Sequence, residues 1–258
     1  MENEIPRVIH QTWKTTVVPN WAKDYYASWL TYNPTWTQKL WTDDECRQFI
    51  AVYEPKYLSL YDSFPKHIMR VDFVRYAWLF HLGGLYVDLD FECFGSFESL
   101  RKPPCQLMLG KSVHGVLSNS IMMSIPKHPF WQKVMSEIHI RAKNLQGIRW
   151  SPSMDVLNTT GPNVVHAVAK QCGYLNKLTR PNTVIIPPAR TFFPYSCFEF
   201  WKKNQKHFPS DVLACHRHQT TWAPHVKYAR MAGIYAVVII LFVVIIVVVC
   251  KMYKRYQQ

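Results

Sequence analysis

The sequence lacks several features that mark other classes of protein. Its seven cysteines include no Cys-x-x-Cys pair, so a structural zinc site is not indicated. Their odd number and irregular spacing favour buried thiols over a disulfide framework, although a single bridge stays open. No internal repeat or low-complexity tract occurs before residue 231, so a repeat architecture is not expected.

Acidic residues are scarce. Only 17 Asp and Glu stand against 30 Lys and Arg, which gives a formal net charge of +13. This balance implies an anionic partner, such as nucleic acid, a membrane surface or a phosphorylated substrate. The basic residues are scattered and form neither an RNA-binding signature nor a long block, so nucleic acid is not the expected partner. A phosphorylated donor together with an anionic membrane surface explains the charge more economically.

The two ends of the chain differ in hydropathy. The first ten residues contain no apolar run, so we expect no cleaved secretory signal. In contrast, the 20 residues from Met231 to Cys250 carry no charge, and as a helix they span about 30 Å, the thickness of a bilayer core. We therefore expect a domain at residues 1–226 and a C-terminal transmembrane anchor at 227–258. Basic residues flank both ends of this run, which leaves its orientation open, and a tail-anchored domain in the cytosol is the simplest arrangement.

The amino-terminal half alternates between strand and helix patterns. Residues 7–13 and 37–42 predict strands, whereas residues 19–34 and 43–53 predict helices. Residues 66–81 follow a helical period that ends at a double glycine. This order predicts an α/β fold with a parallel sheet.

The carboxyl-terminal half gives weaker patterns. Short strands are predicted at 106–112 and 119–126, and a helix at 128–144. Residues 158–173 predict a loop followed by a helix, and residues 183–196 predict a strand and a proline-rich loop. The polar, aromatic segment after residue 196 yields no element.

Asp88 and Asp90 follow an apolar strand pattern, "LYVDLD", directly after the double glycine. Residues i and i+2 of a strand face the same way, so the two carboxylates are expected to aim at one point. In an open α/β sheet, ligands lie beyond the carboxyl ends of the strands, which is where these acids fall. Carboxylate oxygens suit Mg²⁺ or Mn²⁺, and such an ion neutralises a diphosphate leaving group. A pair of solvated loop acids is the alternative for a bare Asp-x-Asp, but the charged helix at 66–81 favours a site.

Five blocks of the sequence resemble glycosyltransferase family 32, the enzymes with a D-x-D sugar-binding signature. In order they are IPRVIHQTWK, NPTWTQKLWTDDE, MRVDFVRYAWLFHLGGLYVDLD, TGPNVV and HRHQTTW. The resemblance covers residues 5–222, and within the family the chain is most similar to the catalytic subunits that mannosylate inositol phosphoceramide. It implies a GT-A-like, Rossmann-type fold in a single domain, a nucleotide-sugar donor, a divalent cation and transfer with retention of configuration.

The resemblance also assigns roles within the most specific block, residues 70–90. Asp88, Asp90 and Arg75 would be catalytic, with Asp90 as the direct metal ligand and Asp88 contacting both donor and metal. Asp72 and Arg75 would hold the hydroxyls and diphosphate of the donor, and Tyr86 would line the same pocket. An ordinary helix ion pair between Asp72 and Arg75 is the alternative.

Other donor and metal contacts implied by the resemblance lie near the two ends of the match. His10 and Trp13 would lie near the nucleotide base, although a strand tryptophan often packs in the core. His216 and His218 would supply the remaining cation and phosphate contacts, and Trp222 would contact the donor. We place His218 ahead of His216 as the metal ligand, because it lies nearer to Trp222 in the sequence.

Three residues are expected on the acceptor side of the site. Asn119 matches positions that face the acceptor in similar enzymes, while Thr160 and Gly161 belong to a Thr-Gly-Pro loop that would shape that side. The alternatives are a turn asparagine and an ordinary turn.

These observations predict an enzyme that transfers mannose from GDP-mannose to a membrane glycolipid such as inositol phosphoceramide. Two alternatives stay open: a hexosyltransferase that uses UDP-galactose or UDP-glucose on a glycan or protein, and a non-catalytic membrane adaptor that retains the fold. A two-metal phosphodiesterase or nuclease would need a larger set of acids and histidines. The expected location is an endomembrane of the Golgi or endoplasmic reticulum, or a viral setting, and a regulatory subunit stays open.

Overall fold

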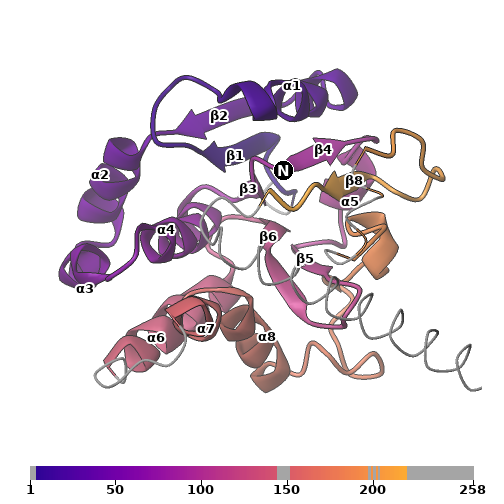
Figure 1. The fold of residues 1–258 in the computed structure, drawn as a ribbon. Coiled ribbons are helices and arrows are strands. Elements are labelled where there is room, and N and C mark those ends of the chain that lie inside the picture. The colour runs from indigo at the N-terminus through magenta and orange to yellow at the C-terminus, as the bar shows by residue number, and fades with distance from the viewer. Residues whose placement is uncertain (1–3, 144–151, 197–198, 200–201, 203, 220–258) are drawn as a thin grey trace, which may run out of the picture. The chain divides into compact units, whose positions relative to one another are not determined.

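The computed structural model describes residues 4–143, 152–196, 199, 202 and 204–219 (Figure 1). Residue contacts divide the chain after His218, and every helix and strand below belongs to the unit that ends there. No helix in the described ranges is long and apolar enough to cross a membrane. The expected transmembrane run at 231–250 and the expected domain boundary at 226 lie outside these ranges and stay predictions.

A mixed six-stranded sheet occupies the middle of this unit, in the order β2-β1-β3-β6-β5-β7 (Figure 1). A separate two-stranded ribbon pairs β4 with β8. The strands are β1 (Val8–Thr12), β2 (Thr37–Trp41), β3 (Gly84–Val87), β4 (Phe91–Cys93), β5 (Leu107–Lys111), β6 (Leu117–Ser124), β7 (Val184–Ile185) and β8 (Ala214–His216).

The prediction of a parallel sheet is correct except at β6, and β5 also runs parallel to β7. β1 lies between β2 and β3 and runs parallel to both, because helices form the crossovers between these strands. β6 runs antiparallel to both β3 and β5. The reason is the short connection at residues 112–116, which folds β5 and β6 into a hairpin without a crossover helix.

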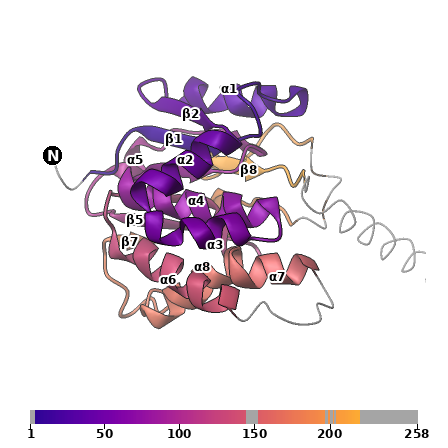
Figure 2. The same cartoon turned by 90° about the vertical axis from the view of Figure 1, so that its left-hand side faces the viewer.

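Helices cover both faces of the sheet (Figure 2). They are η1 (Asn20–Ala22), α1 (Lys23–Tyr32), α2 (Asp43–Tyr53), η2 (Pro55–Tyr57), α3 (Leu58–Ser63), α4 (His67–His81), α5 (Glu98–Arg101), α6 (Pro129–Lys143), α7 (Pro152–Thr159), α8 (Pro162–Gln171) and η3 (Ala189–Thr191). The helices predicted at 43–53 and 66–81 are confirmed, whereas α7 and β8 were not predicted.

The sheet separates two hydrophobic cores, and β3 shows how its alternation feeds both. Leu85 and Val87 enter the core that contains Trp29 of α1, whereas Tyr86 points into the core built by α2, α4, α6 and α8. A strand that is buried on both faces has apolar residues at successive positions, which explains the apolar run of β3 before Asp88.

Helix α4 is buried on all sides along most of its length. Every residue from Asp72 to Phe80 is buried, so the helix lies inside the domain and its charged residues lie there with it. The double glycine ends this helix: Gly83 and Gly84 both have positive φ, and a Cβ at Gly84 would collide with Val8 of β1.

His128 caps the start of α6 from a buried position. Its Nδ1 accepts a hydrogen bond from the backbone N–H of Phe130 at 3.3 Å, and its backbone carbonyl accepts from Trp131 at 3.2 Å. Burial lowers the pKa of the imidazole from 6.5 to about 4. The neutral ring is therefore the form that the folded protein requires.

Replacing His128 with Asn tests this cap. In the wild type the unfolded chain binds a proton near pH 6.5 and the folded chain only near pH 4, so the contribution to stability is full above pH 6.5 and is lost as the pH falls. Asn keeps an acceptor at the N-cap without titrating. Between about pH 7.5 and pH 5, we expect the variant to lose about 2 kcal/mol less unfolding free energy than the wild type in urea titrations. Equal losses would contradict the assignment.

Candidate functional site

Asp88 and Asp90 lie on a turn between β3 and β4. β3 ends at Val87, and the backbone N–H of Phe91 donates to the carbonyl of Asp88 at 3.1 Å, which closes the turn. The prediction that strand alternation aligns the two acids is therefore wrong, although the expected convergence is present. The turn lies at the carboxyl end of β3, next to β6, where the Asp88 N–H donates to the Ser120 carbonyl at 2.8 Å.

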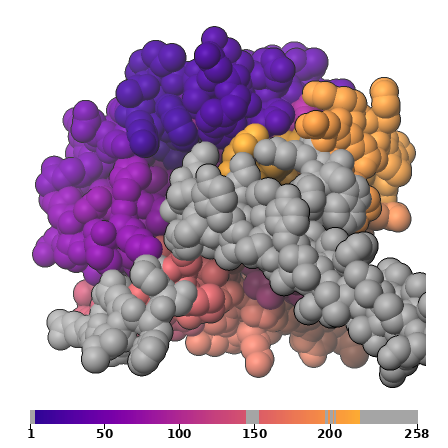
Figure 3. Space-filling model, viewed as in Figure 1, coloured from indigo at the N-terminus to yellow at the C-terminus, as the bar shows by residue number. Residues whose placement is uncertain are grey.

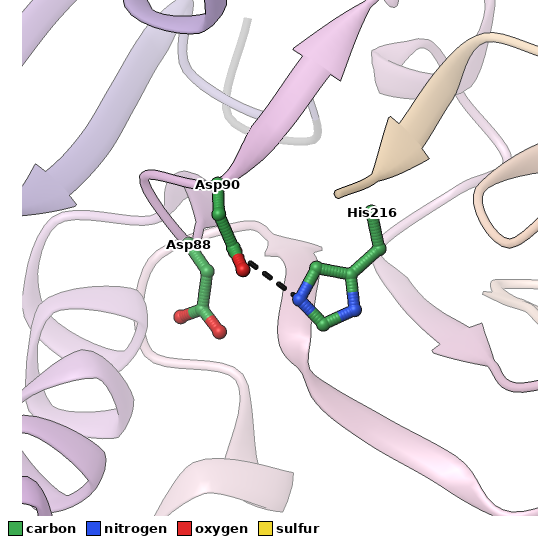
Figure 4. Close-up of side chains that lie close together, drawn as sticks. All are labelled: Asp88, Asp90 and His216. Atoms are coloured by element: carbon green, nitrogen blue, oxygen red, sulfur yellow. Dashed lines mark ion pairs between the residues drawn. The ribbon is translucent and has the colours of Figure 1, made fainter. Parts of the chain in front are cut away.

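The two carboxylates and the imidazole of His216 form a candidate metal centre (Figure 4). One ligand atom from each of the three residues lies within 4.8 Å of the others, and His216 Nε2 is 3.1 Å from an Asp90 oxygen. Their side chains are partly exposed, at 30% for Asp88, 13% for Asp90 and 19% for His216, so an ion could reach them. Oxygen and imidazole ligands fit Mn²⁺, and with added water or phosphate oxygens also Mg²⁺.

His216 rather than His218 joins this group within the part of the chain that the structure describes. The rings of the two histidines are neighbours, with centroids 4.1 Å apart, and His218 has a positive φ of 51°. The preference for His218 rested on its nearness to Trp222 in sequence, whereas the pairing of β8 with β4 decides the geometry. Trp222 lies outside the described residues.

The β4–β8 ribbon brings His216 to the acids. Phe91 of β4 is the register partner of His216, and their rings stack with centroids 4.6 Å apart and an interplanar angle of 8°. β8 has three residues, too few to show an alternating pattern. Sequence patterns therefore gave no signal for this strand, and only the His-x-His motif pointed to it.

Arg75 of α4 lies between two carboxylates. Its guanidinium is 3.1 Å from an oxygen of Asp72 and 3.1 Å from an oxygen of Asp88. It lies over the ring of Tyr86, 4.4 Å from the centroid, and the Tyr86 hydroxyl donates to Asp88 at 2.6 Å. Four residues that the sequence assigned to the donor site thus form one continuous network.

Asp72 receives two further hydrogen bonds, both from residues expected on the acceptor side. The Asn119 amide donates at 2.9 Å and the Thr160 hydroxyl at 2.8 Å. Both residues are buried, and an acceptor contact stays a prediction for them. Tyr76, which the sequence analysis did not assign to the site, completes the set, because its hydroxyl accepts from the Asn119 amide at 3.1 Å and donates to the Thr160 carbonyl at 2.7 Å.

The network concentrates negative charge. Asp72 and Asp88 flank one guanidinium and Asp90 lies beside Asp88, which leaves a formal excess of two negative charges when all three acids are ionised. Burial raises the pKa of Asp72 to about 6 against the opposing effect of Arg75. Burial also raises the pKa of Asp88, again opposed by Arg75 and reinforced by Asp90. A divalent cation would balance this excess charge, which is a second reason why the residues fit a metal.

His10 lies in the protein interior, whereas the resemblance implies a position near the nucleotide base. It is 2% exposed, its Nε2 donates to the carbonyl of Gly83 at 2.9 Å, and its Nδ1 accepts from the indole of Trp41 at 3.1 Å. Burial lowers its pKa to about 4, so the ring is neutral. With both ring nitrogens occupied, we assign His10 a packing role in place of a nucleotide contact.

Trp13 follows β1 at the same end of the sheet as the acidic turn. It is half-buried, and its ring meets the edge of Trp21 with centroids 5.7 Å apart. A contact with a nucleotide base stays a prediction for this residue.

Gly161 precedes the first residue of α8, where a Cβ would be 3.0 Å from the Val156 carbonyl, so close packing between α7 and α8 explains the glycine.

The region that carries the acids matches a known family. Residues 19–106 match the glycosyltransferase sugar-binding region containing the DXD motif. The chain is 38% identical over 161 residues to inositol phosphoceramide mannosyltransferase 2 of Schizosaccharomyces pombe, covering 62% of this chain and 45% of that protein. It is 32% identical to mannosyl phosphorylinositol ceramide synthase CSH1 of Saccharomyces cerevisiae, covering 82% and 57%. The chain thus spans about half the length of these curated relatives.

A viral relative matches over more of its length. The uncharacterised glycosyltransferase L373 of Acanthamoeba polyphaga mimivirus is 27% identical, covering 88% of this chain and 87% of that protein. Among solved structures, the PaToxG glycosyltransferase has a TM-score of 0.53 at 16% identity, covering 68% of this chain and 73% of that one. The ligand-free glycosyltransferase domain of the YGT toxin has a TM-score of 0.50 at 11% identity, covering 71% and 80%. The predicted GT-A-like glycosyltransferase fold is confirmed.

Thr160→Val tests whether the buried network depends on the Thr160 hydroxyl. Valine keeps the shape but removes the donor to Asp72, a hydrogen bond to a buried carboxylate. We expect a loss of about 1.5–3 kcal/mol in unfolding free energy, measured by urea titration. Thr31→Val is the matched control, because this exposed helical hydroxyl bonds only the Ala27 carbonyl in the described contacts, and we expect a change within about 0.5 kcal/mol. Similar losses in both variants would show that the Asp72 bond adds nothing.

Proposed function

Because this chain carries the sugar-binding region of the DXD-containing glycosyltransferase family, we propose that it transfers mannose from GDP-mannose to a membrane glycolipid such as inositol phosphoceramide. The names of the fungal relatives support the sugar and the acceptor. The proposed cofactor is Mn²⁺ or Mg²⁺.

The observation that carries the proposal is the charged group at the carboxyl end of β3. Two aspartates and a histidine converge within metal-binding distance of one another, beside a buried Asp72–Arg75 pair. A structural ion-pair network needs no such excess of carboxylates at a partly exposed edge. A site for a cation and a diphosphate does, because both components carry charge that must be balanced.

The residues divide the task of holding the donor. Asp88, Asp90 and His216 would hold the cation, which when bound supplies charge stabilisation for a diphosphate leaving group. Arg75 is fixed by Asp72 and Asp88, and it adds a second positive charge without the need for reorganisation. Tyr86 orients Asp88 through its hydroxyl.

Asp72 suits a contact with sugar hydroxyls. Its carboxylate is held by Asn119, Thr160 and Arg75, so its orientation is fixed before a ligand arrives. With a pKa of about 6 it is ionised at neutral pH, when it accepts hydrogen bonds only.

Charge and hydropathy support the proposed acceptor and location. A net charge of +13 favours an anionic headgroup, and an inositol phosphate carries one. The uncharged run at 231–250 would anchor the enzyme in the membrane that holds the lipid. An endomembrane location, single-pass insertion and association with a regulatory subunit form part of the proposal.

Asp90→Asn in the full-length protein tests the function. With Mn²⁺, GDP-mannose and inositol phosphoceramide in mixed micelles, we expect the wild type to form a mannosylated lipid and the variant to lose about 100-fold or more of that activity. Asp62→Asn is the control, because Asp62 is an exposed acid paired with Arg47, and its activity should match the wild type. Unchanged activity and unchanged metal-dependent nucleotide binding in Asp90→Asn would show that this site is not the catalytic one. Absence of any transfer by the wild type would favour a non-catalytic adaptor.

A donor panel separates the remaining outcomes. Release of GDP from GDP-mannose, without release of UDP from UDP-glucose or UDP-galactose, supports the proposal. Turnover of a UDP-sugar alone overturns the donor assignment and leaves the glycosyltransferase assignment standing.

A further inference from the structure

A second buried ion pair lies directly behind the candidate metal centre. Arg217, the residue after His216, is 1% exposed, and its guanidinium donates twice to one oxygen of Glu92, at 2.9 Å and 2.5 Å. It also donates to the carbonyl of Gln205 at 2.9 Å and lies over the rings of Phe94 and Phe208. None of these contacts belongs to the donor network described above.

Strand alternation explains how this pair relates to the metal ligands. Neighbouring residues of a strand point to opposite faces, as Phe91 and Glu92 do on β4. Arg217 directly follows the last residue of β8 and continues its pairing, so it leaves the ribbon on the side opposite to His216. On one face His216 stacks on Phe91, and on the other Arg217 binds Glu92. The ribbon is therefore fastened from both faces at the position of the metal ligand.

A backbone hydrogen bond also connects Arg217 to the turn that carries Asp88 and Asp90. The N–H of Arg217 donates to the carbonyl of Asp90 at 2.8 Å, one step beyond the three register pairs of the ribbon. A displacement of Arg217 would therefore shift His216 and disturb the Asp90 end of the turn together. A buried pair of this kind often adds little net stability compared with apolar side chains, so stability alone does not account for its presence.

We propose that Glu92 and Arg217 are positioning residues of the metal centre, which hold His216 beside Asp88 and Asp90 by locking β8 onto β4. This inference rests on the proposed function, because it presumes that the three residues bind a cation. It adds two residues that do not touch the cation but set the distance between its histidine and aspartate ligands.

Binding of Mn²⁺ alone, followed by electron paramagnetic resonance of the free ion, tests the proposal in the full-length protein. We expect Glu92→Gln to raise the Kd for Mn²⁺ about 10-fold or more, the range found when a residue that orients a metal ligand is removed. Lys206→Met is the matched control. This exposed lysine reaches the same carboxylate at 3.5 Å from the solvent side, and we expect its Kd to stay within about 2-fold of the wild type.

A double-mutant cycle separates positioning from general destabilisation. If Glu92 acts through His216, then Glu92→Gln should weaken Mn²⁺ binding in the wild type but not further in a His216→Ala background. Equal effects in both backgrounds would overturn the proposal. Because Glu92→Gln leaves a buried guanidinium without its carboxylate, the double variant Glu92→Gln with Arg217→Met removes both charges, and we expect it to fold and to show the same loss of affinity. An unchanged Kd in that variant would also overturn it.

The outcome for Asp90→Asn keeps this test apart from the test of the function. If Asp90→Asn abolishes Mn²⁺ binding and Glu92→Gln leaves it unchanged, only the positioning role fails. If Asp90→Asn leaves Mn²⁺ binding unchanged, the metal centre itself is wrong, and both proposals fail together.

Discussion

The structure depends on one electrostatic constraint, the pairing of the buried guanidinium of Arg75 with the carboxylates of Asp72 and Asp88, beside which Asp90 adds a third acid. A charge in a protein interior must be paired and hydrogen-bonded, or its desolvation outweighs what it contributes. Arg75 meets this condition through Asp72, Asp88 and the Asn119 carbonyl, and Asp72 meets it through Thr160 as well. The carboxylates still outnumber the guanidinium. The hydrogen bonds of the site are therefore satisfied, but its negative charge is not balanced. That difference is what makes the edge of the sheet suited to a cation and an anionic ligand together.

The fold supplies this group by burying a charged helix. α4 lies between the sheet and the outer helices, so Asp72 and Arg75 are fixed by packing, while the acidic turn stays at the partly exposed end of β3. Strand β6 contributes Asn119 from its place beside β3, and the connection between α7 and α8 contributes Thr160. The fixed and the accessible parts of the site therefore come from different elements. This division allows the ligand-binding carboxylates to meet solvent without loosening the pair behind them.

The sequence predicts the part of the site that is local in the chain. Asp72, Arg75, Tyr86 and Asp88 fall within one helix–glycine–strand block, which carries the most specific part of the family resemblance, and their contacts are close in the chain. It does not predict that Asn119 and Thr160 bind Asp72, because burial of these polar residues follows from strand pairing and helix packing across distant segments. The antiparallel course of β6 and the grouping of His216 with the acids were not predicted, because strand pairing leaves little trace in the local pattern of β6 or β8.

The last described strand shows how the two ends of the chain depend on each other. Figure 3 shows the segment that carries β8, in orange, at the surface beside the first elements of the chain, in indigo. The family match ends at residue 106 and so includes the acids, whereas the histidine comes from β8. A ligand that binds only the assembled site stabilises that assembly by mass action, so a cation held by all three residues would favour the paired ribbon over an open one. The ribbon, by being paired, in turn presents the third ligand at the correct distance. Metal affinity and the pairing of β8 with β4 would thus report on the same equilibrium. Glu92 and Arg217, which hold the ribbon on the face away from the ligands, would then contribute to metal binding together with the ligands themselves.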